Sequence, residues 1–179
     1  HAAPLENPPA VDALALAFAC FFSLLSGYYV LRSVRDAMIA ADGTRLIPTV
    51  FTSVFVCMLL LTPVYGAVVS RLPRRVFLPL VFTAVIVMLG VFALAFRDPL
   101  PSDWVRTAFA IFLSVMNLFT VSVFWSFLSD IFASEQAKRL YGVIAAGGTA
   151  GALAGPLVTR LLVAELGIPQ LMLVSIVGY

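Results

Sequence analysis

Charged side chains are scarce in this sequence. Only 11% of its 179 residues are charged, whereas 62% are hydrophobic; ordinary soluble domains carry roughly a quarter charged residues. A soluble core does not explain this balance. The formal net charge of +2 is also too small to indicate a nucleic-acid partner.

Residues that usually perform catalysis or bind metals are equally rare. The only histidine is His1, and the two cysteines, Cys20 and Cys57, lie in separate apolar runs. No serine-histidine combination and no paired carboxylates support hydrolysis. We therefore expect no enzymatic activity, no cofactor and no metal site, and we expect both thiols to be inert and unpaired.

The sequence contains instead five long apolar runs and the beginning of a sixth. Each of the five approaches the roughly 20 residues of helix that cross a bilayer, and none alternates strictly as a barrel strand does. We predict an all-α membrane protein with an N-terminal tail at 1–11 and a transmembrane helical bundle at 12–179. Its helices are expected at 12–40, 46–70, 76–96, 104–129, 136–163 and 168–179, the sixth being incomplete.

Basic residues are distributed unequally between the connections. Five lie after the second and fourth predicted helices: Arg71, Arg74, Arg75, Lys138 and Arg139. Four lie in or near the opposite connections: Arg45, Arg97, Arg106 and Arg160. Since positive charges favour the cytoplasmic side, we predict a cytoplasmic N-terminus and two cytoplasmic basic loops. We also expect Asp130 to pair with Arg71 or Arg74.

A cluster of charges follows the first apolar run. Arg32 and Asp36 stand at positions i and i+4 with Arg35 beside them, and either Tyr28 or Tyr29 lies one turn earlier on the same face. Two guanidinium groups and one carboxylate leave a net positive site that suits phosphate or carboxylate oxygens. The alternative is a cluster at the outer interface that snorkels and pairs within itself.

Two glycine-containing segments have counterparts in a known transporter superfamily. Gly66-Ala-Val-Val-Ser70-Arg71-Leu-Pro73-Arg74-Arg75 resembles the loop between helices two and three of the major facilitator superfamily, with serine replacing an aspartate and proline a second glycine. The alternative is a plain basic cytoplasmic loop. Gly147, Gly151 and Gly155 form a stripe on which another helix can pack closely. With Pro156 this stripe also resembles a fifth-helix motif of antiporters in the superfamily, although Thr159 and Arg160 stand where that motif ends in glycines.

The stretch from Phe124 to Gly142, together with Tyr-x-x-Leu-Arg-x-x-Arg-Asp ending at Asp36, resembles the ATP:ADP antiporter family and its facilitator-like relatives in free-living bacteria. The resemblance covers about residues 20–160. It implies the N-terminal six-helix bundle of a major facilitator superfamily fold and an antiporter of nucleotides or another organic anion that works by alternating access. It also implies a bacterial inner membrane.

In that family a basic residue of the first helix is important for transport, and Arg35 stands at the matching position. The family also uses an acidic residue in helix four; this chain has none between Arg106 and Asp130, so Asn117 is the nearest polar candidate. The candidate substrate-binding residues are Arg32, Arg35, Asp36, Tyr28 and Asn117.

Two hypotheses about partners follow. A transporter would work against a C-terminal half, embedded in the lipid bilayer, with a small anionic substrate and no nucleic acid. The alternative is a structural or accessory multi-pass subunit of a larger membrane complex without transport activity. A transporter needs a polar cavity facing its second half, whereas an accessory subunit buries the same face against unrelated helices.

Overall fold

The computed structural model describes residues 8–41, 47–71, 74–97, 101–131 and 137–176. Within these ranges the chain is helical and contains no strand. Its helices are α1 (Pro8–Ala41), α2 (Ile47–Arg71), α3 (Arg74–Ala95), α4 (Asp103–Ile131) and α5 (Ala137–Ile176). Helix α1 begins at Pro8; proline is compatible with the first turn of a helix, where no backbone N–H bond is lost.

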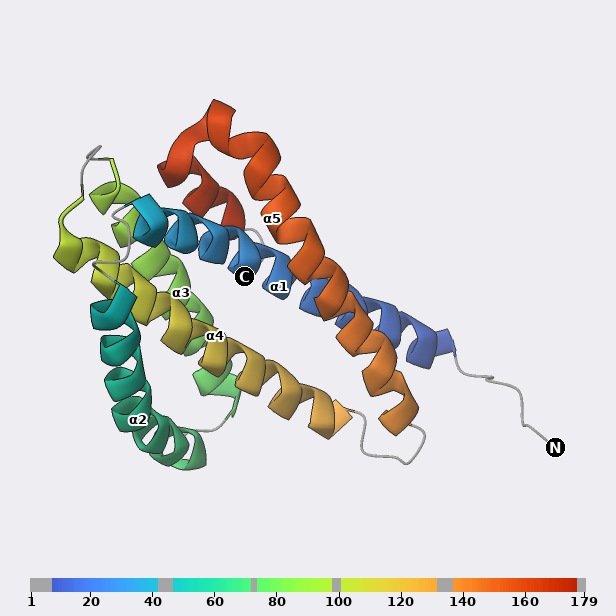
Figure 1. Cartoon of the computed structure of the whole chain (residues 1–179). Helices are drawn as coiled ribbons and strands as arrows, with labels where there is room; N and C mark the ends of the chain where they lie inside the picture. Colours follow the sequence, from blue (N-terminus) through green and yellow to red (C-terminus); the bar gives the residue numbers. More distant parts are fainter. Residues whose placement is uncertain (1–7, 42–46, 72–73, 98–100, 132–136, 177–179) are drawn as a thin grey trace.

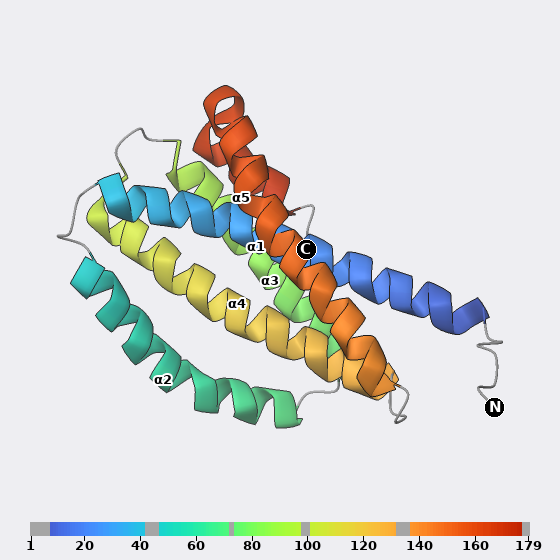
Figure 2. The ribbon, with the colours of Figure 1, turned by 45° about the vertical axis from the view of Figure 1, so that its right-hand side comes forward.

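The helices form a bundle in which each one runs roughly opposite to its predecessor (Figure 1). α5 crosses and packs along α1, and α2 packs along α4. α1 and α4 contact each other between these two pairs, and α3 lies behind them, in contact with α4 and α5 (Figure 2). The ends of α1 and α3 and the starts of α2 and α4 therefore lie on one side of the bundle.

The C-terminal part of α5 is a separate segment after a sharp reversal. Gly167 has φ 74° and ψ 173°, a conformation that favours glycine because it has no Cβ. Pro169 follows two residues later, as is common after a helix end. The sequence placed this boundary between 163 and 168. Beyond the reversal, the segment 168–176 returns toward α3 (Figure 1).

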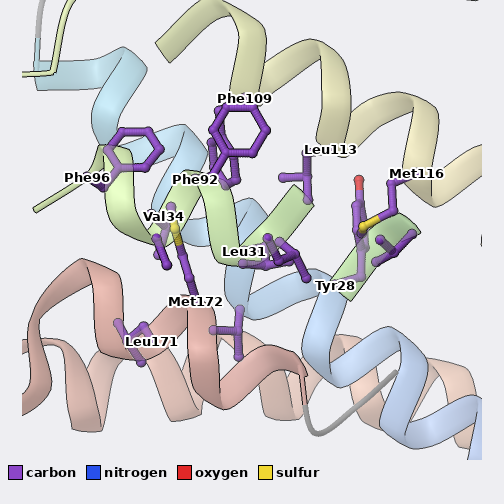
Figure 3. Packing of buried hydrophobic residues seen from close by; sticks show 14 of the residues in the cluster. Tyr28, Leu31, Val34, Phe92, Phe96, Phe109, Leu113, Met116, Leu171 and Met172 are labelled. Carbon is purple, nitrogen blue, oxygen red and sulfur yellow. The ribbon is translucent and has the colours of Figure 1, made fainter. Parts of the chain in front are cut away.

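The main core joins α1, α3, α4 and the segment 168–176 (Figure 3). Phe109 of α4 is fully buried, and its ring lies 5.2 Å from that of Phe92 and 5.3 Å from that of Phe96. A second cluster fills the other end of the α1–α4 contact, where Phe21 stacks on Phe124 at 4.5 Å. These aromatic contacts fix α4 against both α1 and α3.

Four helical spans are long and apolar enough to cross a membrane: Asp12–Ala40, Ile47–Ala67, Asp103–Ser129 and Leu140–Ile176. The apolar part of α3 is shorter, Pro79–Ala95. The surface of α2 is rich in large apolar side chains, with Phe51 and Phe55 both 66% exposed. The helical architecture is that of an all-α, membrane-embedded protein. Cys20 and Cys57 are both free.

Candidate functional site

Arg35 is the most enclosed of the three clustered charges. It lies in the last third of α1, and its side chain is 17% exposed. The guanidinium turns toward α4, where Nη1 lies 3.5 Å from Ser114 Oγ. Ser114 in turn donates to the carbonyl of Ala110 at 2.9 Å, so its lone pairs face Arg35. Arg35 therefore bridges α1 and α4 with part of its hydrogen-bonding capacity.

Asp36 is the counter-ion of both arginines. Its Oδ1 accepts hydrogen bonds from Arg35 Nε at 3.0 Å and Nη2 at 2.8 Å. Its Oδ2 lies 3.7 Å from Arg32 Nε. Two guanidinium groups thus share one carboxylate, which leaves a net charge of about +1 at the cluster. The Asp36 and Arg32 side chains are 53% and 44% exposed, so water and dissolved anions can compete for these contacts.

The aromatic partner of the cluster is Tyr29. The Arg32 guanidinium carbon lies 5.3 Å from the centre of the Tyr29 ring, within cation–π range. Tyr28 instead belongs to the core, where its side chain is buried beside Met116 of α4 (Figure 3). Its ring meets that of Tyr29 edge-on at 5.3 Å. Tyr28 therefore supports the residue that contacts Arg32 and does not itself reach the guanidinium.

A pocket of about 240 Å³ opens beside the charges. Arg35, Asp36 and Ser114 form its polar part, and α2 supplies an apolar wall that includes Val50 and Phe51. The pocket lies between α1, α2 and α4, near the side of the bundle where α1 ends. Ser114 and the α2 wall were not among the predicted site residues, because they meet Arg35 and Asp36 only through the packing of the helices.

Asn117 does not line this pocket. It is partly exposed on α4, one turn beyond Ser114, and it makes no side-chain hydrogen bond with any residue that the structure describes. The structure thus brings Arg32, Arg35 and Asp36 together, adds Ser114, and places Tyr28 and Asn117 further away.

The glycine stripe of α5 packs directly on α1, as predicted. A Cβ on Gly151 would overlap the carbonyl oxygen of Phe22, and one on Gly155 would lie 2.6 Å from Tyr29 Cβ. Real side chains essentially never approach so closely, so any larger residue must push the helices apart. Because Gly155 abuts Tyr29, whose ring contacts Arg32, this packing also helps to determine where the cluster lies.

The predicted pairing of Asp130 with Arg71 or Arg74 lies outside the described residues, because the placement of the Asp130 and Arg74 side chains is not described. The same is true of the side chains of Arg75, Lys138 and Arg139 in the basic loops.

Comparison of the chain with protein-family models, with curated proteins and with solved structures finds no match.

Proposed function

We propose that the chain is the N-terminal part of a secondary transporter that moves a small organic anion, with nucleotides as the first candidate. The observation that carries this proposal is the pair Arg32 and Arg35 with one carboxylate between them, at the edge of a pocket within the bundle. Ionisable groups in a membrane helix are costly and commonly mark a substrate pathway. The resemblance to the ATP:ADP antiporter family, with Arg35 at the important basic position, adds to it.

The order of helix contacts also supports a facilitator-like bundle. In such folds the first three helices are related to the next three by an inverted repeat. The inverted repeat would make α1 equivalent to α4 and α2 equivalent to α5. A contact between α1 and α5 should then have a counterpart between α4 and α2, and both contacts are present. The same exchange relates α3 to the segment 168–176, and these two also contact each other in the core. These paired contacts support the proposal of two inverted triplets.

The geometry indicates how an anion would bind. A phosphate or carboxylate would replace Asp36 on the exposed side of the two guanidinium groups and accept paired hydrogen bonds from Arg35. The Ser114 hydroxyl, already in contact with Arg35, would hold the guanidinium plane in place. Anion binding and the Asp36 contacts are then mutually exclusive. In the absence of substrate, Asp36 would thus offset one of the two positive charges.

Binding of radiolabelled ATP to the full-length protein tests the proposal. Arg35→Ala should weaken binding by about tenfold or more, because a charged hydrogen-bond donor is lost. Arg35→Lys should recover part of the loss, since the positive charge remains while the paired donors of the guanidinium group are removed. Arg160→Ala, which removes an exposed arginine of α5, is the control. A phosphate-free nucleoside should not bind.

If neither ATP nor another organic phosphate binds, or if Arg35→Ala binds as well as the parent protein, the nucleotide site is wrong. The alternative of a structural or accessory membrane subunit then takes its place.

We further propose that the protein lies in a bacterial inner membrane with a cytoplasmic N-terminus. Single-cysteine variants at Arg75 and Asp103, in a background without Cys20 and Cys57, test this orientation. A membrane-impermeant thiol reagent should reach the two positions from opposite sides, Arg75→Cys from the cytoplasm. Labelling of both from one side contradicts the orientation.

A further inference from the structure

We propose that a second pocket, between the end of α3 and the segment 168–176, binds one anionic phospholipid molecule. The pocket has a volume of about 330 Å³ and is separate from the arginine cluster of α1. The lipid phosphate would lie on Arg97 and Gln170, with one acyl chain along the apolar wall below them. This inference does not depend on the proposed transport function.

The backbone holds Arg97 in a fixed place just beyond α3. Its N–H donates to the carbonyl of Leu94 at 3.2 Å, and the N–H of Phe96 donates to that of Phe92 at 2.9 Å. The Phe96 side chain is buried against Phe109. Since the apolar part of α3 ends at Ala95, the Arg97 guanidinium comes at the level where a bilayer changes from hydrocarbon to phosphate groups.

The polar end of the pocket suits an anion. Arg97 is exposed, and none of the carboxylates that the structure describes forms an ion pair with it. Gln170 comes from the other wall, and its Oε1 lies 3.6 Å from the position that a Cβ on Gly167 would take. A guanidinium and an amide group on opposite walls can both donate to phosphate oxygens.

The other end of the pocket is an apolar groove that opens on the outer surface of the bundle. Ala93 is buried at its base, whereas Leu94 and Leu173 on its two sides are 60% and 52% exposed. A Cβ on Gly90 would have nothing within 4 Å, so the glycine leaves the groove open without being needed for helix packing. A free phosphate ion would make no favourable contact with this apolar wall, whereas a hydrocarbon chain would cover it. The combination therefore indicates a lipid.

Native mass spectrometry of the full-length protein in detergent, titrated with phosphatidylglycerol or phosphatidylcholine, tests the site. The parent protein should retain phosphatidylglycerol in preference to phosphatidylcholine. Arg97→Gln should lower the affinity for phosphatidylglycerol about tenfold, because a charged hydrogen bond to the lipid phosphate is lost. It should weaken phosphatidylcholine less, because the choline cation already offsets the attraction between that lipid and Arg97, so the preference for the anionic lipid should fall. Arg160→Gln makes the same charge change on α5 and should retain the parent's preference.

Gly90→Phe examines the groove separately. The ring should occupy the acyl-chain position and abolish the preferential binding, while circular dichroism and thermal unfolding stay as in the parent. Inorganic phosphate and glycerol 3-phosphate should not compete with the lipid. The proposal is overturned if the two lipids bind equally to the parent, if Arg97→Gln binds phosphatidylglycerol like the parent, or if inorganic phosphate competes and Gly90→Phe has no effect.

Discussion

Helices α5 and α2 flank the bundle in corresponding places but attach to it in opposite ways. α5 approaches α1 through Gly147, Gly151 and Gly155, where not even a Cβ fits. α2 lies against α4 and turns large apolar side chains outward, and its only glycine, Gly66, has nothing within 4 Å of a Cβ. Lipid tails are as apolar as leucine, so exposed apolar surface does not drive helices together in a membrane. Close backbone approach holds α5, and larger side chains hold α2.

We expect the largest difference in stability when a bulky residue replaces a glycine in each helix. Gly151→Leu should separate α5 from α1 and destabilise the protein by roughly 3 kcal/mol or more, because overpacking adds to lost backbone contact. Gly66→Leu, the same change in α2, should leave the thermal unfolding temperature in detergent within about 2 °C of the parent's. Equal effects of the two substitutions would show that the glycine stripe is not what holds α5.

Truncation of a phenylalanine compares the core with the outer surface of α2. Phe109→Ala should cost about 3 kcal/mol, because a fully buried ring with two edge-to-face partners leaves a cavity. Phe55→Ala should cost less than about 0.5 kcal/mol if lipid or detergent covers that face. Denaturant-induced unfolding in mixed micelles measures both. A large loss of stability at Phe55 would mean that α2 packs against another protein surface there.

In the pocket beside α2, we expect a substitution to strengthen ATP binding, by a smaller free energy than the losses of stability above. Asp36→Asn removes the carboxylate that neutralises Arg32 and Arg35, so ATP should bind a few-fold more tightly, corresponding to about 1 kcal/mol. Asp103→Asn is the matched control, because Asp103 pairs with Arg106 at 2.7 Å outside the pocket. Weaker binding in Asp36→Asn would show that the carboxylate positions the arginines instead of competing with the substrate.

The smallest difference is expected between two threonines. Thr159 of α5 donates to the carbonyl of Gly155 at 3.1 Å and lies 3.5 Å from that of Val30 on α1. Thr62 of α2 donates to the carbonyl of Met58 in its own helix, at 2.6 Å. Thr159→Val should therefore destabilise the protein by about 0.6 kcal/mol, the average for an interhelical hydrogen bond in a membrane protein. Thr62→Val should have no measurable effect on thermal unfolding.

Local spacing made part of this structure predictable. The four-residue period of the glycines predicted a close helix contact, and the i, i+4 spacing placed Arg32 and Asp36 on one helical face, where they pair. Periodicity did not distinguish Tyr28 from Tyr29, because both stand about one turn from Arg32. It also could not identify Ser114, which lies 79 positions from Arg35 in the sequence and meets it only through the packing of α4 on α1.

The position of Tyr29 joins the arginine cluster mechanically to α5. Its ring lies under Arg32, its Cβ abuts the backbone at Gly155, and its carbonyl accepts a hydrogen bond from Ser33 at 2.9 Å. If α1 rotated alone about its axis, Tyr29 would be driven into the α5 backbone. A movement that displaces Arg32 relative to the rest of the bundle therefore requires α1 and α5 to move together as one unit.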